Sequence, residues 1–207
     1  MPGREPEEDI LRNIHADGEG IGSSGCVLGQ RPANPFPSNH TRVRVGDREL
    51  ATVLFTDFVA STERATEVGD AAWKAMLDGH ERTAEEAIGR AGGRLIDKTG
   101  DGLLATFTGP SQAVSAACAV QDAALGLGVS VRAGIDTGEI ERRGDRIGGI
   151  GVHIAARVMS LAQTGEVLAS RTVRDLAVGS KLEFEDRGTH TLKGVSDSWQ
   201  ILAVAGT

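Results

Sequence analysis

Two acidic residues mark a short predicted hairpin, RLIDKTGDGLLATF, over residues 94–107. Asp101 stands between two glycines at the turn, and Asp97 precedes it by four residues. A third acid, Asp57, ends the apolar run ATVLFTD. Carboxylates that meet at strand ends, beside glycines that permit close approach, are the oxygen ligands that a hard divalent cation needs. Asp-Gly is also a favoured hairpin tip, so Asp101 by itself could be only a turn former.

The order of the predicted elements decides whether Asp57 and Asp101 can meet. Apolar periodicity and glycine punctuation predict a β-α-β-β-α-β order, at residues 51–57, about 73–91, 94–98, 103–107, about 110–127 and 129–136. In this ferredoxin-like arrangement the first and third strands lie antiparallel and adjacent in the sheet centre. Asp57 ends the first strand and Asp101 precedes the third, so we expect both carboxylates at one edge. That expectation favours a divalent metal site over a simple turn.

The remaining chain adds a helix and a C-terminal αβ segment. GIGVHIAARVMSLAQ, residues 149–163, reads as a helix, and His153 and Arg157 project from the same face because they are four residues apart. The fold class is therefore α/β (α+β), with a ferredoxin-like core and a C-terminal extension. Residues 1–48 are polar and rich in Gly and Pro, which predicts a flexible N-terminal extension before one domain over residues 49–207.

Composition excludes several classes of protein. The 207 residues carry a formal net charge of −7, which argues against nucleic-acid binding, since phosphates require positive charge opposite them. The two cysteines, Cys26 and Cys118, are far apart, which predicts no disulfide framework and fits a reducing compartment. No signal peptide and no apolar run of about 20 residues is visible. We therefore expect a cytoplasmic protein that does not enter a membrane.

Five segments together resemble the class III nucleotidyl cyclase catalytic domain, in the variety common in actinobacteria, which carries His in its VHIAAR helix. They span about residues 50–204 in the family's order, and they are VLFTDFVASTERATEVGD, KTGDGLLATF, VRAGIDTGEI, GVHIAARVMSLAQTGEVLAS and FEDRGTHTLKGV. The resemblance implies that residues 49–207 form a cyclase catalytic domain. It also implies a head-to-tail homodimer with two active sites at the subunit interface.

The resemblance further implies a metal and phosphate site. Asp57 and Asp101 of one chain would hold two divalent ions, Mg²⁺ or Mn²⁺, with Phe58 in the same metal site. The turn from Phe58 to Thr62, including Ser61, would offer backbone N–H groups to the triphosphate near a helix N-terminus. Two basic residues, Arg132 and Lys193, match family positions that contact phosphate.

The implied activity is conversion of a nucleoside triphosphate, ATP in the first instance, to a 3′,5′-cyclic monophosphate and pyrophosphate for intracellular signalling. The ribose 3′-hydroxyl attacks the α-phosphate in line, and catalysis is mostly positioning and charge stabilisation. Arg157 matches the arginine that stabilises charge at the reacting phosphate. His153 stands where most relatives have an Asn that orients the ribose, although it could equally be a packed core histidine.

Two positions depart from the family. Adenylate cyclases usually read the base with Lys and Asp where this chain has Asp97 and Arg146, and Lys98 is one residue out of register, on the opposite strand face. Three interpretations stay open. Asp97 and Arg146 pair at the interface and leave the base weakly read, or they read guanine, uracil or cytosine, or the site is degenerate.

Two other classes of protein compete with an enzyme. A cyclase-fold dimer could serve as a regulatory or nucleotide-binding module, although a scaffold has no physical need for both acids and the phosphate-contacting cations. An RNA-binding ferredoxin-like module needs sheet-face aromatics and basic surroundings, and the acidic total charge argues against it.

Overall fold

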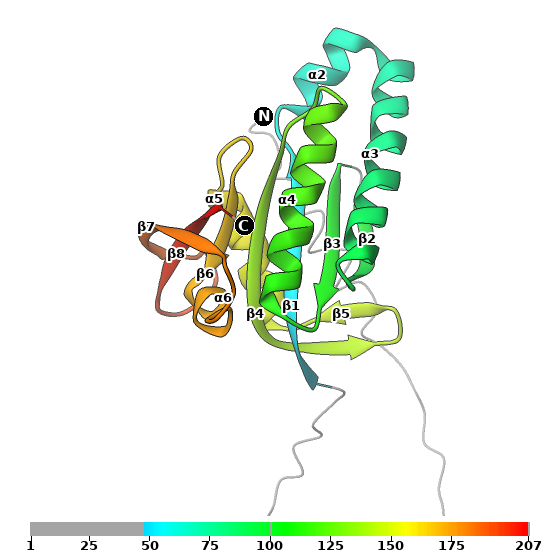
Figure 1. The fold of residues 1–207 in the computed structure, drawn as a ribbon. Helices are drawn as coiled ribbons and strands as arrows, with labels where there is room; N and C mark the ends of the chain where they lie inside the picture. The colour runs from blue at the N-terminus through cyan, green and yellow to red at the C-terminus, as the bar shows by residue number, and fades with distance from the viewer. Residues whose placement is uncertain (1–47, 100, 207) are drawn as a thin grey trace, which may run out of the picture.

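The structure, a computed structural model, describes residues 48–99 and 101–206 (Figure 1). The predicted N-terminal extension, except its last residue, lies outside the described residues. Strands lie at Arg48–Phe58 (β1), Arg94–Thr99 (β2), Gly102–Phe107 (β3), Val131–Arg143 (β4), Arg146–Gly148 (β5), Val167–Ser170 (β6), Glu183–Thr191 (β7) and Ser198–Gly206 (β8). Helices lie at Ser61–Val68 (α2), Asp70–Arg90 (α3), Pro110–Gly126 (α4), Ile150–Leu161 (α5) and Arg171–Leu176 (α6).

The sheet confirms the predicted topology. Its strand order is β2-β3-β1-β4-β6-β8-β7, and β5 pairs with β4 as a hairpin. β1 runs antiparallel to both β3 and β4 in the centre, as the ferredoxin-like order requires. β6, β7 and β8 form the C-terminal extension of the same sheet. In the described part of the chain, no helix is both long and apolar enough to cross a lipid bilayer.

Helices cover the two faces of the sheet, with α3 and α4 on one face and α5 on the other (Figure 1). The apolar run of β1 follows from this double cover, because a central strand with helices on both faces is buried on both. Leu54 packs in the cluster that includes α3 and α4, whereas Val53 and Phe55 pack in the cluster that includes α5. The strand ends of β1 are therefore fixed by the core on both sides.

A close approach fixes α5 against the sheet. A Cβ on Gly134 of β4 would lie 2.1 Å from the backbone nitrogen of Met159 and 2.6 Å from the backbone oxygen of Ala155. Only glycine permits this contact between strand and helix backbones. Gly134 thus sets the depth at which α5 lies, and with it the position of the predicted catalytic residues on that helix.

One buried histidine adjoins the end of β1. His80 of α3 is 1% exposed, its ring centroid lies 4.6 Å from that of Phe58, and neither ring nitrogen has a hydrogen-bond partner among the described residues. Burial lowers the pKa of His80 from 6.5 to about 4. Between these values the unfolded chain binds a proton that the folded chain does not, so the folded state loses up to roughly 3 kcal/mol as pH falls through this window.

We expect His80→Leu to be close to neutral at pH 7 and to reduce the loss of stability between pH 6.5 and pH 4. Burial raises the pKa values of Asp57 and Asp136, so these groups change stability in the opposite direction. The measure is therefore the difference in free energy of unfolding between variant and wild type at each pH, from denaturant titrations. His190→Leu is the control, and equal pH slopes for wild type and His80→Leu would contradict the prediction.

Candidate active site

The structure brings the two predicted metal-binding acids together. Asp57 of β1 pairs with Gly102 of β3 in the antiparallel register, directly beside Asp101. The Asp57 side chain is 1% exposed, and burial is the main cause that raises its pKa. The negative charge of Asp101 raises the pKa of Asp57 further. The two carboxylates are therefore close enough to repel each other, and a cation bound between them would relieve that repulsion.

Arg132 neutralises part of this charge. It stands opposite Asp57 in the β1–β4 register, and its Nη2 and Nε donate to Asp57 Oδ2 at 2.7 and 3.2 Å. Asp57 Oδ1 is buried with no hydrogen-bond partner among the described residues. Arg132 was predicted only as a phosphate ligand, and this ion pair was not predicted. Counting the antiparallel register between the first and fourth strands would have revealed it.

The donor set fits a divalent ion that also binds substrate. Among the described residues, no group of three or more His, Cys, Asp or Glu side chains converges, so the protein offers the pair of carboxylates. Mg²⁺ typically uses one or two carboxylates plus substrate phosphates and water. The Phe58 side chain packs in the core, 5.5 Å from Trp73 between ring centroids. Of Phe58, only the main-chain oxygen could therefore serve as a metal ligand.

The predicted phosphate-binding turn leads into α2. Ser61 and Thr62 begin this helix, after Ala60 in a left-handed conformation with φ 57°. Together with Asp101 they line an open cavity of about 420 Å³, whose remaining lining residues are Ala65, Thr66, Asp70, Trp73 and Leu77. The first N–H groups of α2 have no partner within the helix, which favours an anion nearby. Ser61 and Thr62 thus share this cavity with one of the two predicted metal-binding acids, Asp101.

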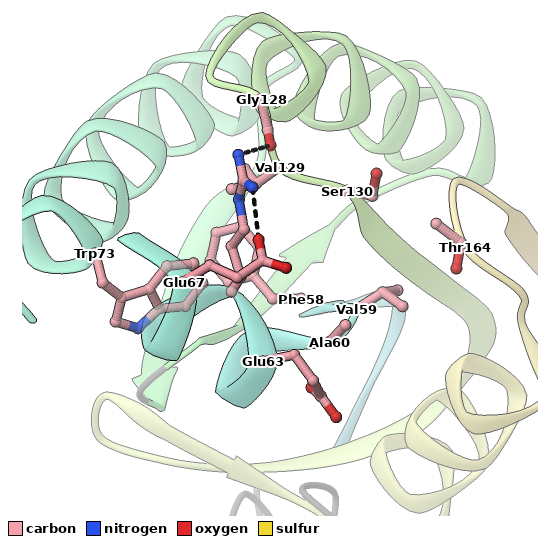
Figure 2. A pocket seen from close by; sticks show the side chains of 11 residues that line it. Phe58, Val59, Ala60, Glu63, Glu67, Trp73, Gly128, Val129, Ser130 and Thr164 are labelled. Carbon is pink, nitrogen blue, oxygen red and sulfur yellow. Dashed lines mark hydrogen bonds and ion pairs between the residues drawn. The ribbon is translucent and has the colours of Figure 1, made fainter. Parts of the chain in front are cut away.

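A second cavity, of about 400 Å³, lies beside the same turn (Figure 2). Figure 2 shows Phe58 and Trp73 on one side and Gly128 to Ser130 on another, with Glu63 and Glu67 from α2. Arg64 donates to Glu67 Oε2 at 3.0 Å and to the Gly128 carbonyl at 3.5 Å. This cavity therefore combines two glutamates with one paired arginine, and none of the predicted metal-binding or phosphate-binding side chains except Phe58 lines it.

The strand carrying the predicted base-reading acid contains a β-bulge. The β2–β3 register shifts between Leu95 and Asp97, so Asp97 pairs with Leu104 and Lys98 pairs with Leu103. Leu104 belongs to the α5-side cluster and Leu103 to the α3–α4-side cluster. Paired residues share a face, so Asp97 lies on the α5 side and Lys98 on the other. The prediction that Lys98 points away from Asp97 is confirmed.

Lys98 is held by acids on α3. Its Nζ lies 3.0 Å from Glu85 Oε2 and 3.6 Å from Glu81 Oε2, and the hydrogen bond with Glu85 raises the pKa of Lys98. The half-buried Asp97 accepts a hydrogen bond from the Lys98 backbone N–H at 2.8 Å. Lys98 therefore does not replace the lysine that usually reads adenine in adenylate cyclases. Its ammonium group pairs with Glu85 and Glu81 on the opposite face of the sheet from Asp97.

The second predicted base-reading residue, Arg146, is exposed at the start of β5. The preceding turn is tied to β2, because Arg94 Nη2 donates to Asp145 Oδ1 at 2.5 Å. The β4–β5 hairpin thus lies beside the strand that carries Asp97, as Figure 1 also shows. The two predicted base-reading positions are therefore on neighbouring elements.

His153 and Arg157 are both half-buried on α5. The neighbouring residues Val152, Ile154, Ala155, Ala156, Val158 and Met159 are buried and pack in the two clusters that contain α5. By helical spacing, His153 and Arg157 share the outward stripe with Ile150 and Leu161, which are 55% and 37% exposed. On the outward face of α5, the predicted catalytic pair therefore lies between two exposed apolar residues.

The structure does not place Lys193 beside Asp57. Lys193 is exposed in the turn between β7 and β8, and β4 and β6 separate β8 from β1 in the sheet. Three strand spacings amount to about 14 Å. Within one chain, Lys193 is thus not among the residues gathered around the two acids.

Solved structures with this fold define its class. The guanylyl cyclase Cya2 matches with a TM-score of 0.69 and 26% identity, over 78% of this chain and 94% of that chain. The adenylyl cyclase CyaB from P. aeruginosa matches with a TM-score of 0.69 and 23% identity, over 77% and 95%. The chain therefore has the fold of the class III adenylate/guanylate cyclase domains.

A sequence relative agrees with that class. The chain is 30% identical over 164 residues to a putative adenylate cyclase 3 of Rhizobium meliloti (strain 1021), which covers 72% of this chain and 27% of that protein. The chain thus spans about a quarter of the length of this relative. None of the established protein-family models matches the chain.

Proposed function

We propose that this chain is a nucleotidyl cyclase that converts a nucleoside triphosphate, ATP in the first instance, to its 3′,5′-cyclic monophosphate and pyrophosphate. The carrying observation is the buried Asp57 carboxylate beside Asp101, with one oxygen bound by Arg132 and the other without a partner. This cluster adjoins the cavity that Ser61 and Thr62 line. The proposed catalytic domain is residues 49–207, and a cytoplasmic location stays a prediction.

In the proposed reaction, some of the described residues hold the metal ions and others bind phosphate. When bound, two divalent ions would lower the pKa of the ribose 3′-hydroxyl and neutralise the polyphosphate. Asp57 and Asp101 would hold these ions. Arg132 and the first N–H groups of α2 would bind phosphate oxygens and align the α-phosphate for in-line attack.

We propose that the remaining groups come from a second copy of the chain. α5 presents His153 and Arg157 on its outward stripe between the exposed Ile150 and Leu161, which suits a contact with another subunit. In a head-to-tail homodimer this stripe would face the partner's acids. His153 would orient the ribose, Arg157 would stabilise charge at the reacting phosphate, and Lys193 would reach phosphate from its distant turn.

Asp97 and Arg146 stand at the two positions that would recognise the nucleotide base. The chain resembles both a guanylyl and an adenylyl cyclase, so the fold does not decide between them. A carboxylate such as Asp97 can accept from guanine N1–H and N2–H, and an arginine such as Arg146 can donate to guanine O6 or N7. Weak reading of ATP, use of GTP, UTP or CTP, and a degenerate nucleotide-binding dimer remain the alternatives.

One assay separates these alternatives. The full chain is incubated with ATP, GTP, UTP and CTP in turn, with Mn²⁺, and cyclic product is identified by chromatography and mass spectrometry. We expect a 3′,5′-cyclic nucleotide from at least one of them. Absence of cyclic product from all four, at a protein concentration that maintains dimers, would leave a nucleotide-binding module as the function.

The base-reading assignment predicts a switch of preference. Asp97→Lys combined with Arg146→Asp restores the usual adenylate cyclase pair and should shift kcat/KM towards ATP, by roughly 10²-fold or more relative to the other bases. The ratio of kcat/KM values between ATP and each competing triphosphate is the measurement. Lys98→Ala, on the opposite face, is the matched control and should leave the ratio unchanged. An unchanged ratio in the double variant would remove both residues from base recognition.

A further inference from the structure

Arg132 bonds to only one of the two metal-site acids. Its side chain is 23% exposed, and its guanidinium donates twice to Asp57 Oδ2. Asp101 is half-buried, and among the described residues Arg132 makes no ion pair with it. The same guanidinium is the group to which the proposed function assigns a phosphate. One cation therefore has two competing anionic partners.

The burial of Asp57 strengthens its hold on Arg132 against a competing phosphate. The Asp57 carboxylate is 1% exposed, and a carboxylate taken out of water needs a counter-charge. In this structure Arg132 supplies it. A divalent ion at Asp57 would bind the unpartnered Oδ1, and its charge would then lie against the guanidinium on Oδ2 of the same carboxylate.

From this geometry we propose that Arg132 is a built-in counter-ion that opposes a metal at Asp57 and is released when a triphosphate binds. The triphosphate draws the guanidinium away from Oδ2, the carboxylate regains its full charge for a metal at Oδ1, and metal and triphosphate bind interdependently. The proposal rests on the proposed function, because it requires Asp57 to be a metal ligand and Arg132 to be a phosphate ligand. It adds a positioning role that Arg132 performs before any chemistry.

The first test measures metal binding without nucleotide. Mn²⁺ alone is titrated into the full-length chain, and free Mn²⁺ is followed by electron paramagnetic resonance. Arg132→Met should bind Mn²⁺ at least about tenfold more tightly than wild type. A cation bonded directly to a carboxylate weakens the binding of a proton to it by about tenfold or more, and we expect a similar effect on a metal ion. Arg64→Met is the control, because it removes a positive charge from the same end of the sheet without touching Asp57. Equal affinities in wild type and Arg132→Met, or an equal gain in Arg64→Met, would overturn the proposal.

The second test uses the anion without the metal, and it keeps the proposal falsifiable if Arg132→Met fails to fold. Inorganic tripolyphosphate is titrated calorimetrically in the presence of EDTA. Asp57→Asn should bind it more tightly than Asp101→Asn, although both remove one negative charge from one site. Where Arg132→Met folds, the difference should also disappear in variants that carry it. Equal tripolyphosphate affinities of Asp57→Asn and Asp101→Asn would refute the counter-ion role.

The outcomes distinguish this proposal from the function on which it rests. Failure of the wild type and of Arg132→Met to bind Mn²⁺, even with a non-hydrolysable triphosphate, would remove the metal site and the proposed function together. Mn²⁺ binding that depends on Asp57 but is unaffected by Arg132→Met would remove the counter-ion role alone.

Discussion

Replacing Asp57 by asparagine should lower cyclase turnover by at least about 10³-fold, because the metal contributes several kcal/mol of charge stabilisation and each 1.4 kcal/mol is about tenfold in rate. Asparagine keeps the size of the side chain at this buried position but removes its charge. The fold should survive, since Leu54 and Phe55 still pack on both faces of β1. The measurement is kcat with the best triphosphate, alongside circular dichroism and thermal unfolding.

Asp136 provides a matched control for that variant. It is also a buried acid, 2% exposed, and it lies on β4, where its Oδ1 accepts a hydrogen bond from Ser170 Oγ at 2.5 Å. Asp136→Asn makes the same chemical change one strand away and should retain most activity. Comparable loss in Asp136→Asn and Asp57→Asn would show that turnover follows general damage to the sheet rather than a metal ligand.

Replacing Arg157 by methionine should lower kcat by about 10²–10³-fold with a much smaller change in KM, because its charge is required mainly in the transition state. Methionine keeps an unbranched side chain at this half-buried position and removes its charge. Arg171→Met is the control, since Arg171 is an exposed arginine on α6 that pairs with Asp175. An increase in KM without a loss of kcat would instead assign Arg157 to ground-state binding.

The sequence pattern predicted the central architecture because it depends on buried apolar runs. β1 is buried on both faces from Ala51 to Phe58, and such a run is visible in any sequence. Once β1 and β3 were expected as antiparallel neighbours, the approach of Asp57 and Asp101 followed from the topology alone. The resemblance then supplied roles for His153 and Arg157 that no local pattern could give.

Other features were outside the reach of periodicity. α2 contains no buried residue, so it has no hydrophobic face to predict. Only the N-terminus of a helix near the turn from Phe58 to Thr62 was expected there. The bulge between Leu95 and Asp97 decides which face Asp97 occupies, and bulges depend on pairing with the partner strand. The ion pairs of Arg132 with Asp57 and of Lys98 with Glu85 depend on strand register and helix placement.

In the proposed homodimer, acids from one chain and the α5 arginine of another complete one active site. Asp57→Asn and Arg157→Met chains, each expected to be at least about 10²-fold less active than wild type, are co-expressed in equal amounts and purified together. Random pairing makes half of the dimers mixed, and each mixed dimer has one intact site of two, so we predict about one quarter of wild-type activity. A co-expressed sample no more active than the two variants assayed separately would contradict the shared site.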